Sequence, residues 1–424
     1  MKQDSQLGRG FRRLWLATGV SSVGDGMVLV AFPLLALTLT HDPVVIAGLV
    51  AVEQAPALLV ALPAGVMADR RNRRSLILAT EITRFIALAV FGACILAGAD
   101  SLPLIFVTAF LLGALSVSFE VLSGACLPDM VEEEQLVPAN TKLMTALLAG
   151  REMVGQAAGG AVFALASSIP FLADAVSFVG SAVLLRSAVA DKEPAPAESS
   201  AWADLRGGLR WFSRQPVLRL LAGIIATLAF CQAAVFGVMV LYATTRLHLH
   251  GAGYGLLLAA AATGTLIASP LAPRLHRRIG SAACIIGAAV IAGVAYPVLA
   301  VTHSAVVAGF MLMVEALSVV VGNAASRSVR QSTVPAEMQG RAAAAYQTLI
   351  LVSLPLGALA GGLATSAVGI PDAFAAAGGF QLLVVAALGP RLAARMAPVV
   401  DLRPEETGAI DLRQQPGVVP EQAA

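Results

Sequence analysis

The strongest constraint on this chain is a series of long apolar runs separated by short polar turns. Each run is about 20 residues long, the length that a helix needs to cross the hydrocarbon core of a membrane. Helices satisfy their own backbone hydrogen bonds in lipid, whereas the edges of an open sheet do not. We therefore predict an all-α integral membrane protein with twelve spans, at 14–39, 43–66, 75–98, 102–123, 142–166, 169–187, 216–243, 252–273, 281–301, 304–326, 342–366 and 371–394.

Composition supports a lipid environment for most of the surface. Hydrophobic residues make up 58% of the chain and charged residues only 13%, with a mean hydropathy of +0.81. A soluble globular chain carries about 25% charged residues, so this one could not cover a water-exposed surface. The four cysteines form no CxxC pair, and we expect neither a disulfide framework nor a metal site. The net charge of +2 gives no indication of nucleic-acid binding.

The distribution of Lys and Arg predicts the topology. If the N-terminus is cytoplasmic, nearly all basic residues fall in inside segments, and the outside loops hold only Arg246. The positive-inside rule then places both termini in the cytoplasm of a cell-membrane protein. The polar stretch between the sixth and seventh runs is also inside. Within it, Trp202, Leu205, Leu209 and Phe212 fall on one face of a predicted amphipathic surface helix.

This linker divides the chain into two six-span halves that repeat weakly. The predicted organisation is a bundle at 1–187, a linker at 188–215, a second bundle at 216–396 and a disordered tail at 397–424. The fifth and eleventh spans carry matching glycine clusters, which we expect to let helices approach closely. These clusters are Gly155, Gly159 and Gly160 in the first half, and Gly357, Gly361 and Gly362 in the second. Two parallel halves of this kind are typical of secondary transporters.

The loop after the second span resembles motif A of the major facilitator superfamily, a glycine, an acid and then a basic cluster. The matching residues are Gly65, Asp69, Arg70, Arg73 and Arg74. Asn72 stands where the family usually has glycine. The stretch Gly155–Gly160 resembles motif C of drug/proton antiporters, with Gln156 in place of its proline, and Leu127–Val131 is similar to the branch that holds macrolide-efflux pumps and the enterobactin exporter.

The resemblance implies a monomeric, non-enzymatic transporter that has no cofactor and binds protons and an amphiphilic small molecule. It also implies that Asp69 pairs with arginines across the two halves and closes the cytoplasmic side. The competing interpretation is that the arginines of motif A are topology charges only. No Walker A loop is present, so ATP is not expected to drive transport.

Ionisable residues within the spans are the sharpest indication of function, because an unpaired charge in lipid costs at least a few kcal/mol. The proton-coupling candidates are Asp25, Glu53, Glu81, Arg84 and Glu315. Asp25 and Arg84 lie at similar depths and are expected to be able to pair. The alternative for Asp25 is a packing acid that is hydrogen-bonded to a neighbour.

Other charged residues are given structural interpretations. Arg151 and Glu152 are expected to link the fifth span to motif A, Glu120 to be solvated, and Asp174 to lie close to the outer surface. The functional prediction is proton-coupled export. A proton-coupled importer of a nutrient is the alternative within transporters, and a non-transporting multi-pass protein is the alternative outside them.

The topology predicts that residue 199 faces the cytoplasm. A maleimide that cannot cross membranes should fail to label a Ser199→Cys variant in intact cells, if the four native cysteines are first replaced. A His303→Cys variant, in a predicted outside loop, serves as the positive control. Strong labelling at residue 199 would contradict the six-plus-six topology.

Overall fold

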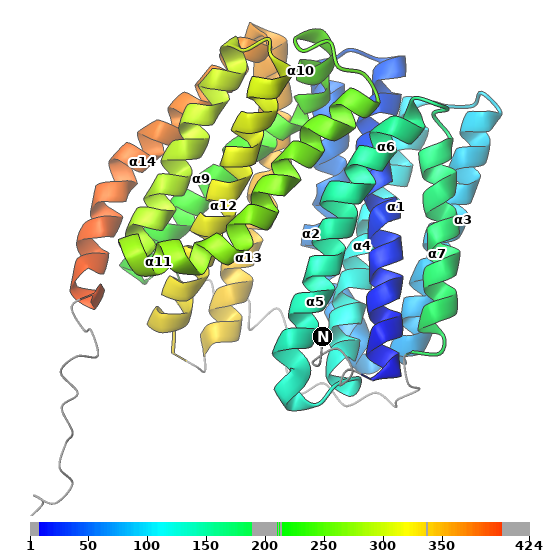
Figure 1. Ribbon diagram of the computed structural model, residues 1–424, viewed down its shortest axis with the longest axis horizontal. Helices are drawn as coiled ribbons and strands as arrows, with labels where there is room; N and C mark the ends of the chain where they lie inside the picture. The colour runs from blue at the N-terminus through cyan, green and yellow to red at the C-terminus, as the bar shows by residue number, and fades with distance from the viewer. Residues whose placement is uncertain (1–7, 189–209, 211, 213, 336–337, 401–424) are drawn as a thin grey trace, which may run out of the picture.

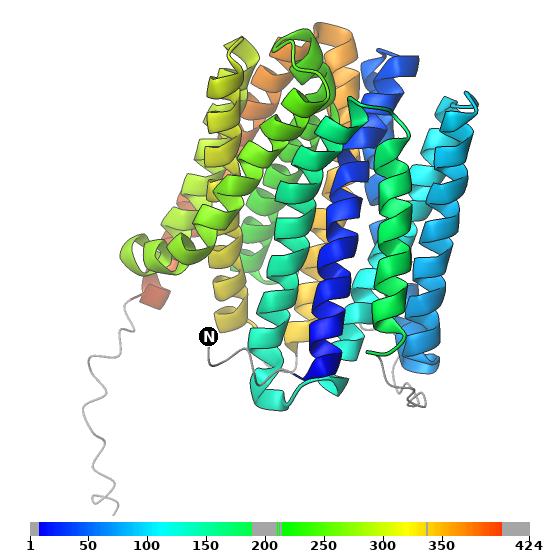
Figure 2. The same ribbon diagram turned by 45° about the vertical axis from the view of Figure 1, so that its right-hand side comes forward.

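The computed structural model describes residues 8–188, 210, 212, 214–335 and 338–400, without the side chains of 62, 68–70 and 397–400. The described chain is helical and has no strand. Its helices cross the molecule in two bundles that stand side by side (Figure 1, Figure 2). The prediction of twelve spans in two pseudo-symmetric halves is confirmed. Most of the predicted linker and tail lie outside the described residues, so the amphipathic helix is not described.

The first half contains six spans. They are formed by α1 (Arg9–Leu39), α2 (Pro43–Arg70), α3 (Arg73–Leu96), α4 (Leu102–Cys126), the consecutive segments α5 (Leu136–Leu148), η3 (Ala149–Gly155) and α6 (Gln156–Phe163), and α7 (Ile169–Leu185). Two short 3₁₀ turns, η1 (Leu127–Asp129) and η2 (Glu133–Gln135), join α4 to α5.

The second half also contains six spans, and two of them belong to the single long element α11. The elements are α9 (Pro216–Gly237) with α10 (Met239–Thr245), α11 (Ala252–Val301), α12 (Ala305–Thr333), α13 (Gln339–Val368) and α14 (Ile370–Val400). Within α11, Gly280 has φ +80°, a conformation open to glycine that is not helical, so the chain turns back there and α11 comprises the eighth and ninth spans.

The starts of α2 and α3 follow from capping residues in the turns before them. The Asp42 carboxylate accepts the backbone N–H of Val44 at 2.8 Å, and Pro43 occupies the first helical position of α2. Asn72 caps α3 by accepting the N–H of Ser75 at 3.2 Å. The side chain at this departure from motif A therefore starts the next helix.

The fifth span is the main irregularity. Its middle, η3, is a π-helix, a wider turn that is often found at functional sites. The segment lies against α1 at backbone distance. A side chain added at Gly150 would meet the Ser22 Cβ at 2.8 Å, and one added at Gly155 would meet the Gly26 Cα at 2.7 Å. The glycines of η3 therefore face α1, whereas Arg151 and Glu152 of the same segment face the cavity between the halves.

The two glycine clusters have equivalent surroundings in the two halves. Gly159 faces the Met27 backbone of α1, and Gly361 faces the Ala234 backbone of α9, so each packs against the first helix of its own half. A side chain at either position would lie 2.6 Å from a Cα of that helix. Such small faces let two helices approach more closely than larger side chains would.

The last glycine of each cluster lies against the other half. Gly160 of α6 faces Gly251 and Gly255 at the start of α11, so that a side chain added at Gly160 would lie 3.0 Å from the Gly255 Cα. Gly362 of α13 faces Pro43 and the Ala47 side chain at the start of α2. The halves therefore meet at two pseudo-equivalent glycine crossings, both near the face opposite the chain's N-terminus (Figure 1).

Candidate functional site

A charged cluster is buried in the first half and is centred on Arg84 of α3, whose side chain is 1% exposed. Its guanidinium forms an ion pair with Asp25 of α1 and donates to Glu81 at 3.2 Å. It also donates to Ser116 of α4 at 3.0 Å and lies 4.0 Å from the centroid of the Phe178 ring. The pairing that depth predicts for Asp25 and Arg84 is present in the structure.

The two carboxylates of this cluster differ in their access to solvent. Glu81 is fully buried, whereas the Asp25 side chain is 26% exposed and lines a central cavity. The small flanks of Asp25 do not leave empty space beside it. A side chain at Gly24 would meet the Ser177 Oγ of α7 at 2.8 Å, and one at Gly26 would meet the Gly155 Cα at 2.8 Å. Asp25 is thus fixed by close helix contacts and open only toward the cavity.

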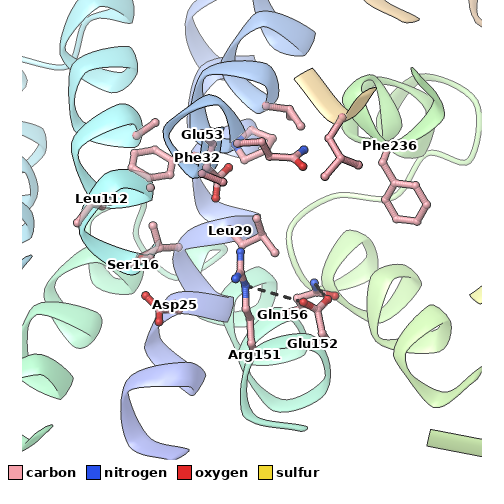
Figure 3. A pocket seen from close by; sticks show the side chains of 18 of the residues that line it. Asp25, Leu29, Phe32, Glu53, Leu112, Ser116, Arg151, Glu152, Gln156 and Phe236 are labelled. Carbon is pink, nitrogen blue, oxygen red and sulfur yellow. Dashed lines mark hydrogen bonds and ion pairs between the residues drawn. The ribbon is translucent and has the colours of Figure 1, made fainter. Parts of the chain in front are cut away.

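The cavity has a volume of about 410 Å³, within the range of roughly 300–1,000 Å³ that small-molecule sites occupy. Both halves form its wall. The first half contributes all the charged side chains, from α1, α2, α4, η3 and α7, together with apolar ones such as Leu29, Phe32 and Leu112. The second half contributes apolar and aromatic side chains from α9, α11 and α13 (Figure 3). The second-half residues are Phe236, Tyr254, Leu258, Leu351 and Leu354.

Arg151 and Glu152 of the π-helix lie on the cavity wall, which differs from their predicted link to motif A. Arg151 is 3.8 Å from a Glu152 carboxylate oxygen and 4.0 Å from one of Glu120. Gln156 donates to Glu152 at 2.7 Å (Figure 3). The residue that replaces the proline of motif C therefore supports a cavity carboxylate.

Glu120 and Asp174 line the cavity, although no role in transport is predicted for them from the sequence. Glu120 is exposed, as predicted, but the space it faces is the cavity. Asp174, predicted to lie close to the outer surface, is 1% exposed, lines the cavity and accepts a hydrogen bond from Ser177 at 2.8 Å. Both acids fall in or beside apolar runs, and that signal could have identified them.

The remaining candidates lie apart from this cavity or are only partly described. Glu315 of α12 is fully buried in the second half and accepts hydrogen bonds from Tyr296 and Gln232, each at 3.0 Å. It does not line the cavity and so does not face Glu53 across it. Among the described residues, no group of His, Cys, Asp and Glu side chains could hold a metal ion.

Motif A is described in part. Arg73 donates to Asp129 at 2.8 Å and to the Ala125 carbonyl at 2.9 Å, which ties α3 to the end of α4 within one half. Arg74 is half-buried, and Gly65 has open space where a side chain would extend. The side chains of Asp69 and Arg70 lie outside the described residues.

We predict that the first half depends on Arg84 for stability. An Arg84→Met variant leaves buried carboxylates without their cation, a loss of about 3–5 kcal/mol. The expected result is a large fall in thermal stability in detergent. Arg73→Gln, which breaks an ion pair that is more than a quarter exposed, should lose only about 0–1 kcal/mol. Equal stability of the two variants would contradict the prediction.

Comparison with known proteins agrees with this architecture. A family model described as transmembrane secretion effector matches residues 7–417. The search of curated proteins found no match. A bacterial homologue of the human lysosomal transporter Spinster, inward-facing and occupied, gives a TM-score of 0.71 at 17% identity over 91% of this chain and 96% of that one.

Two further solved structures show the same fold. A bacterial homologue of the iron transporter ferroportin, inward-facing, gives a TM-score of 0.68 at 21% identity over 91% of this chain and 98% of that one. The nucleoside transporter NupG gives 0.70 at 12% identity over 89% and 98%. The chain therefore belongs to the transmembrane secretion effector family and is a multi-pass membrane transporter of the major facilitator superfamily.

Proposed function

We propose that this protein exports an amphiphilic small molecule across the cell membrane in exchange for protons, with both termini in the cytoplasm. The observation that carries the proposal is the Asp25–Arg84–Glu81 cluster, which opens through Asp25 into a cavity that both halves enclose. A cavity lined by both apolar rings and charged side chains suits a molecule that has both characters. Multidrug resistance is one biological setting for such an exporter.

The net charge of the Asp25–Arg84–Glu81 cluster favours the binding of one proton. One guanidinium pairs with two carboxylates, so these three side chains carry one negative charge when both acids are ionised, and Asp174 lies near them as a further acid. A single proton makes the cluster neutral. Asp25 is the member that the cavity reaches, and Arg84 keeps Glu81 as its partner when Asp25 is protonated. Uptake of a proton therefore leaves no buried cation unpaired.

Helix contacts provide a route from this proton site to the crossings between the halves. Asp25 lies on α1, beside Gly26, which touches η3. Two residues further along α1 is Met27, whose backbone contacts Gly159 of α6. The next residue of α6, Gly160, forms the crossing to α11. A shift of α1 on protonation would move this crossing, and alternating access requires such a coupling.

We predict that Asp25→Asn abolishes export driven by a pH gradient, because the amide mimics the protonated acid permanently. A growth-inhibition screen with overexpressing cells identifies a substrate, which is then assayed in proteoliposomes. Substrate binding should remain measurable, and counterflow exchange, which needs no net proton movement, should be partly retained. Full gradient-driven export by the variant would make Asp25 a packing acid, and would move the proton site to Glu53 or Glu315.

A further inference from the structure

The charges around the cavity are strongly unbalanced. Five carboxylates line it and only one cationic side chain among the described residues, Arg151, does so. The five acids are Asp25, Glu53, Glu120, Glu152 and Asp174. Arg84 lies behind the wall and is shared between Asp25 and the buried Glu81. An anionic substrate would therefore enter a space of its own sign, whereas a cation would reduce the repulsion among the acids.

Four of these acids already have polar partners. Asp25 has Arg84, Asp174 has Ser177, and Glu120 and Glu152 share Arg151, with Gln156 donating to Glu152 as well. Glu53 of α2 is different. Within the part of the chain that the structure describes, its side chain has no hydrogen bond and no ion pair. It is the cavity carboxylate that no described side chain contacts directly, although Arg151 acts on it from a longer distance.

The backbone holds Glu53 firmly in this position. Gly113 of α4 lies against the turn of α2 that carries it, so that a side chain at Gly113 would be 3.3 Å from the Glu53 carbonyl carbon and 3.3 Å from the Pro56 ring. Figure 3 shows Glu53 above the group of Arg151, Glu152 and Gln156, with Phe236 on the other side of the view.

Aromatic rings from both halves share the same cavity with this carboxylate. Phe32 belongs to the first half, and Phe236 and Tyr254 to the second. Ring faces attract organic cations, and they also cover the apolar part of such a molecule. A carboxylate without a direct ion-pair partner, together with aromatic side chains, suits the recognition of a positive charge on an apolar body.

We propose that the substrate is an organic cation and that Glu53 is the residue that binds its positive charge. The proposal rests on the proposed function, because it names the substrate class of the same cavity. It separates the duties of two acids: Asp25 exchanges the proton, and Glu53 holds the cation. The substrate then supplies the direct ion-pair partner that Glu53 does not have among the described residues.

The test uses two probes of nearly the same shape and opposite charge, tetraphenylphosphonium and tetraphenylborate. Equilibrium binding of each radiolabelled ion to the purified protein in detergent is the measurement. The wild-type protein should bind tetraphenylphosphonium at least about tenfold more tightly, which corresponds to about 1.4 kcal/mol. Glu53→Gln should remove most of that preference and leave tetraphenylborate binding unchanged or stronger. Glu53→Asp, which keeps the charge, should retain part of it.

Glu120→Gln is the matched control, because it removes the same charge from the same cavity at an exposed position beside Arg151. The loss of affinity for tetraphenylphosphonium in this variant should be several-fold smaller than the loss in Glu53→Gln. Equal losses in the two variants would overturn the role of Glu53. Equal or tighter binding of tetraphenylborate by the wild-type protein would overturn the cationic substrate class.

Transport assays separate this inference from the proposed function. If tetraphenylphosphonium binds through Glu53 but is not moved in proteoliposomes under a pH gradient, the inference holds and the export proposal fails. If the gradient drives tetraphenylborate and the protein does not bind tetraphenylphosphonium, export holds and the inference fails.

Discussion

The first half of this transporter is organised around one buried guanidinium. A cation inside the hydrocarbon region is tolerated only when fixed groups replace its hydration, and Arg84 obtains them from α1, α3 and α4 together with the Phe178 ring of α7. These contacts determine how the four helices stand relative to one another. They also fix Asp25 at the cavity wall, because the Arg84 guanidinium pairs with its carboxylate on the side away from the cavity. The site and the stability of the bundle thus depend on the same interaction.

Glycine contacts connect this cluster to the boundary between the halves. Along η3 and α6 the chain touches α1 at Gly150, Gly155 and Gly159 and then touches α11 at Gly160. The second half repeats the pattern on α13, where Gly361 contacts α9 and Gly362 contacts α2. Because closely packed backbones transmit small displacements, the proposed protonation of Asp25 would shift the crossing at Gly160.

The halves differ in chemistry although they share this architecture. Charged cavity residues come from the first half, while the second half contributes rings and aliphatic side chains. The buried acid of the second half, Glu315, is satisfied at one oxygen by the neutral donors Tyr296 and Gln232. We interpret the first half as the half that senses charge, while apolar side chains of both halves pack against a substrate.

The sequence predicted the spans and one tertiary pair, for identifiable reasons. Hydrocarbon thickness fixes helix length, so apolar runs locate the spans closely, and equal depth suggested Asp25 with Arg84. Helix rotation was not accessible, since it depends on packing. Arg151 and Glu152 were consequently predicted to face motif A, and the π-helix that turns them to the cavity leaves no pattern in the sequence.

Contacts between distant helices were equally hidden. Nothing in the sequence connects Tyr296, Gln232 and Glu315, which lie on three helices. The glycine clusters indicated close helix contacts, but only the structure separates Gly159, which packs within its half, from Gly160, which crosses to the other.

In the proposed mechanism, protonation of Asp25 makes the two faces of the transporter open in alternation. Paired spin labels measure this directly, with one pair at His41 and Val368 across the glycine-crossing face and another at Thr141 and Arg278 across the face of the N-terminus. In lipid nanodiscs, lowering the pH should lengthen the first distance and shorten the second. Both changes should have their midpoint at the same pH. Asp25→Asn should abolish this pH response. Distances that change together, or that do not change with pH, would contradict the account.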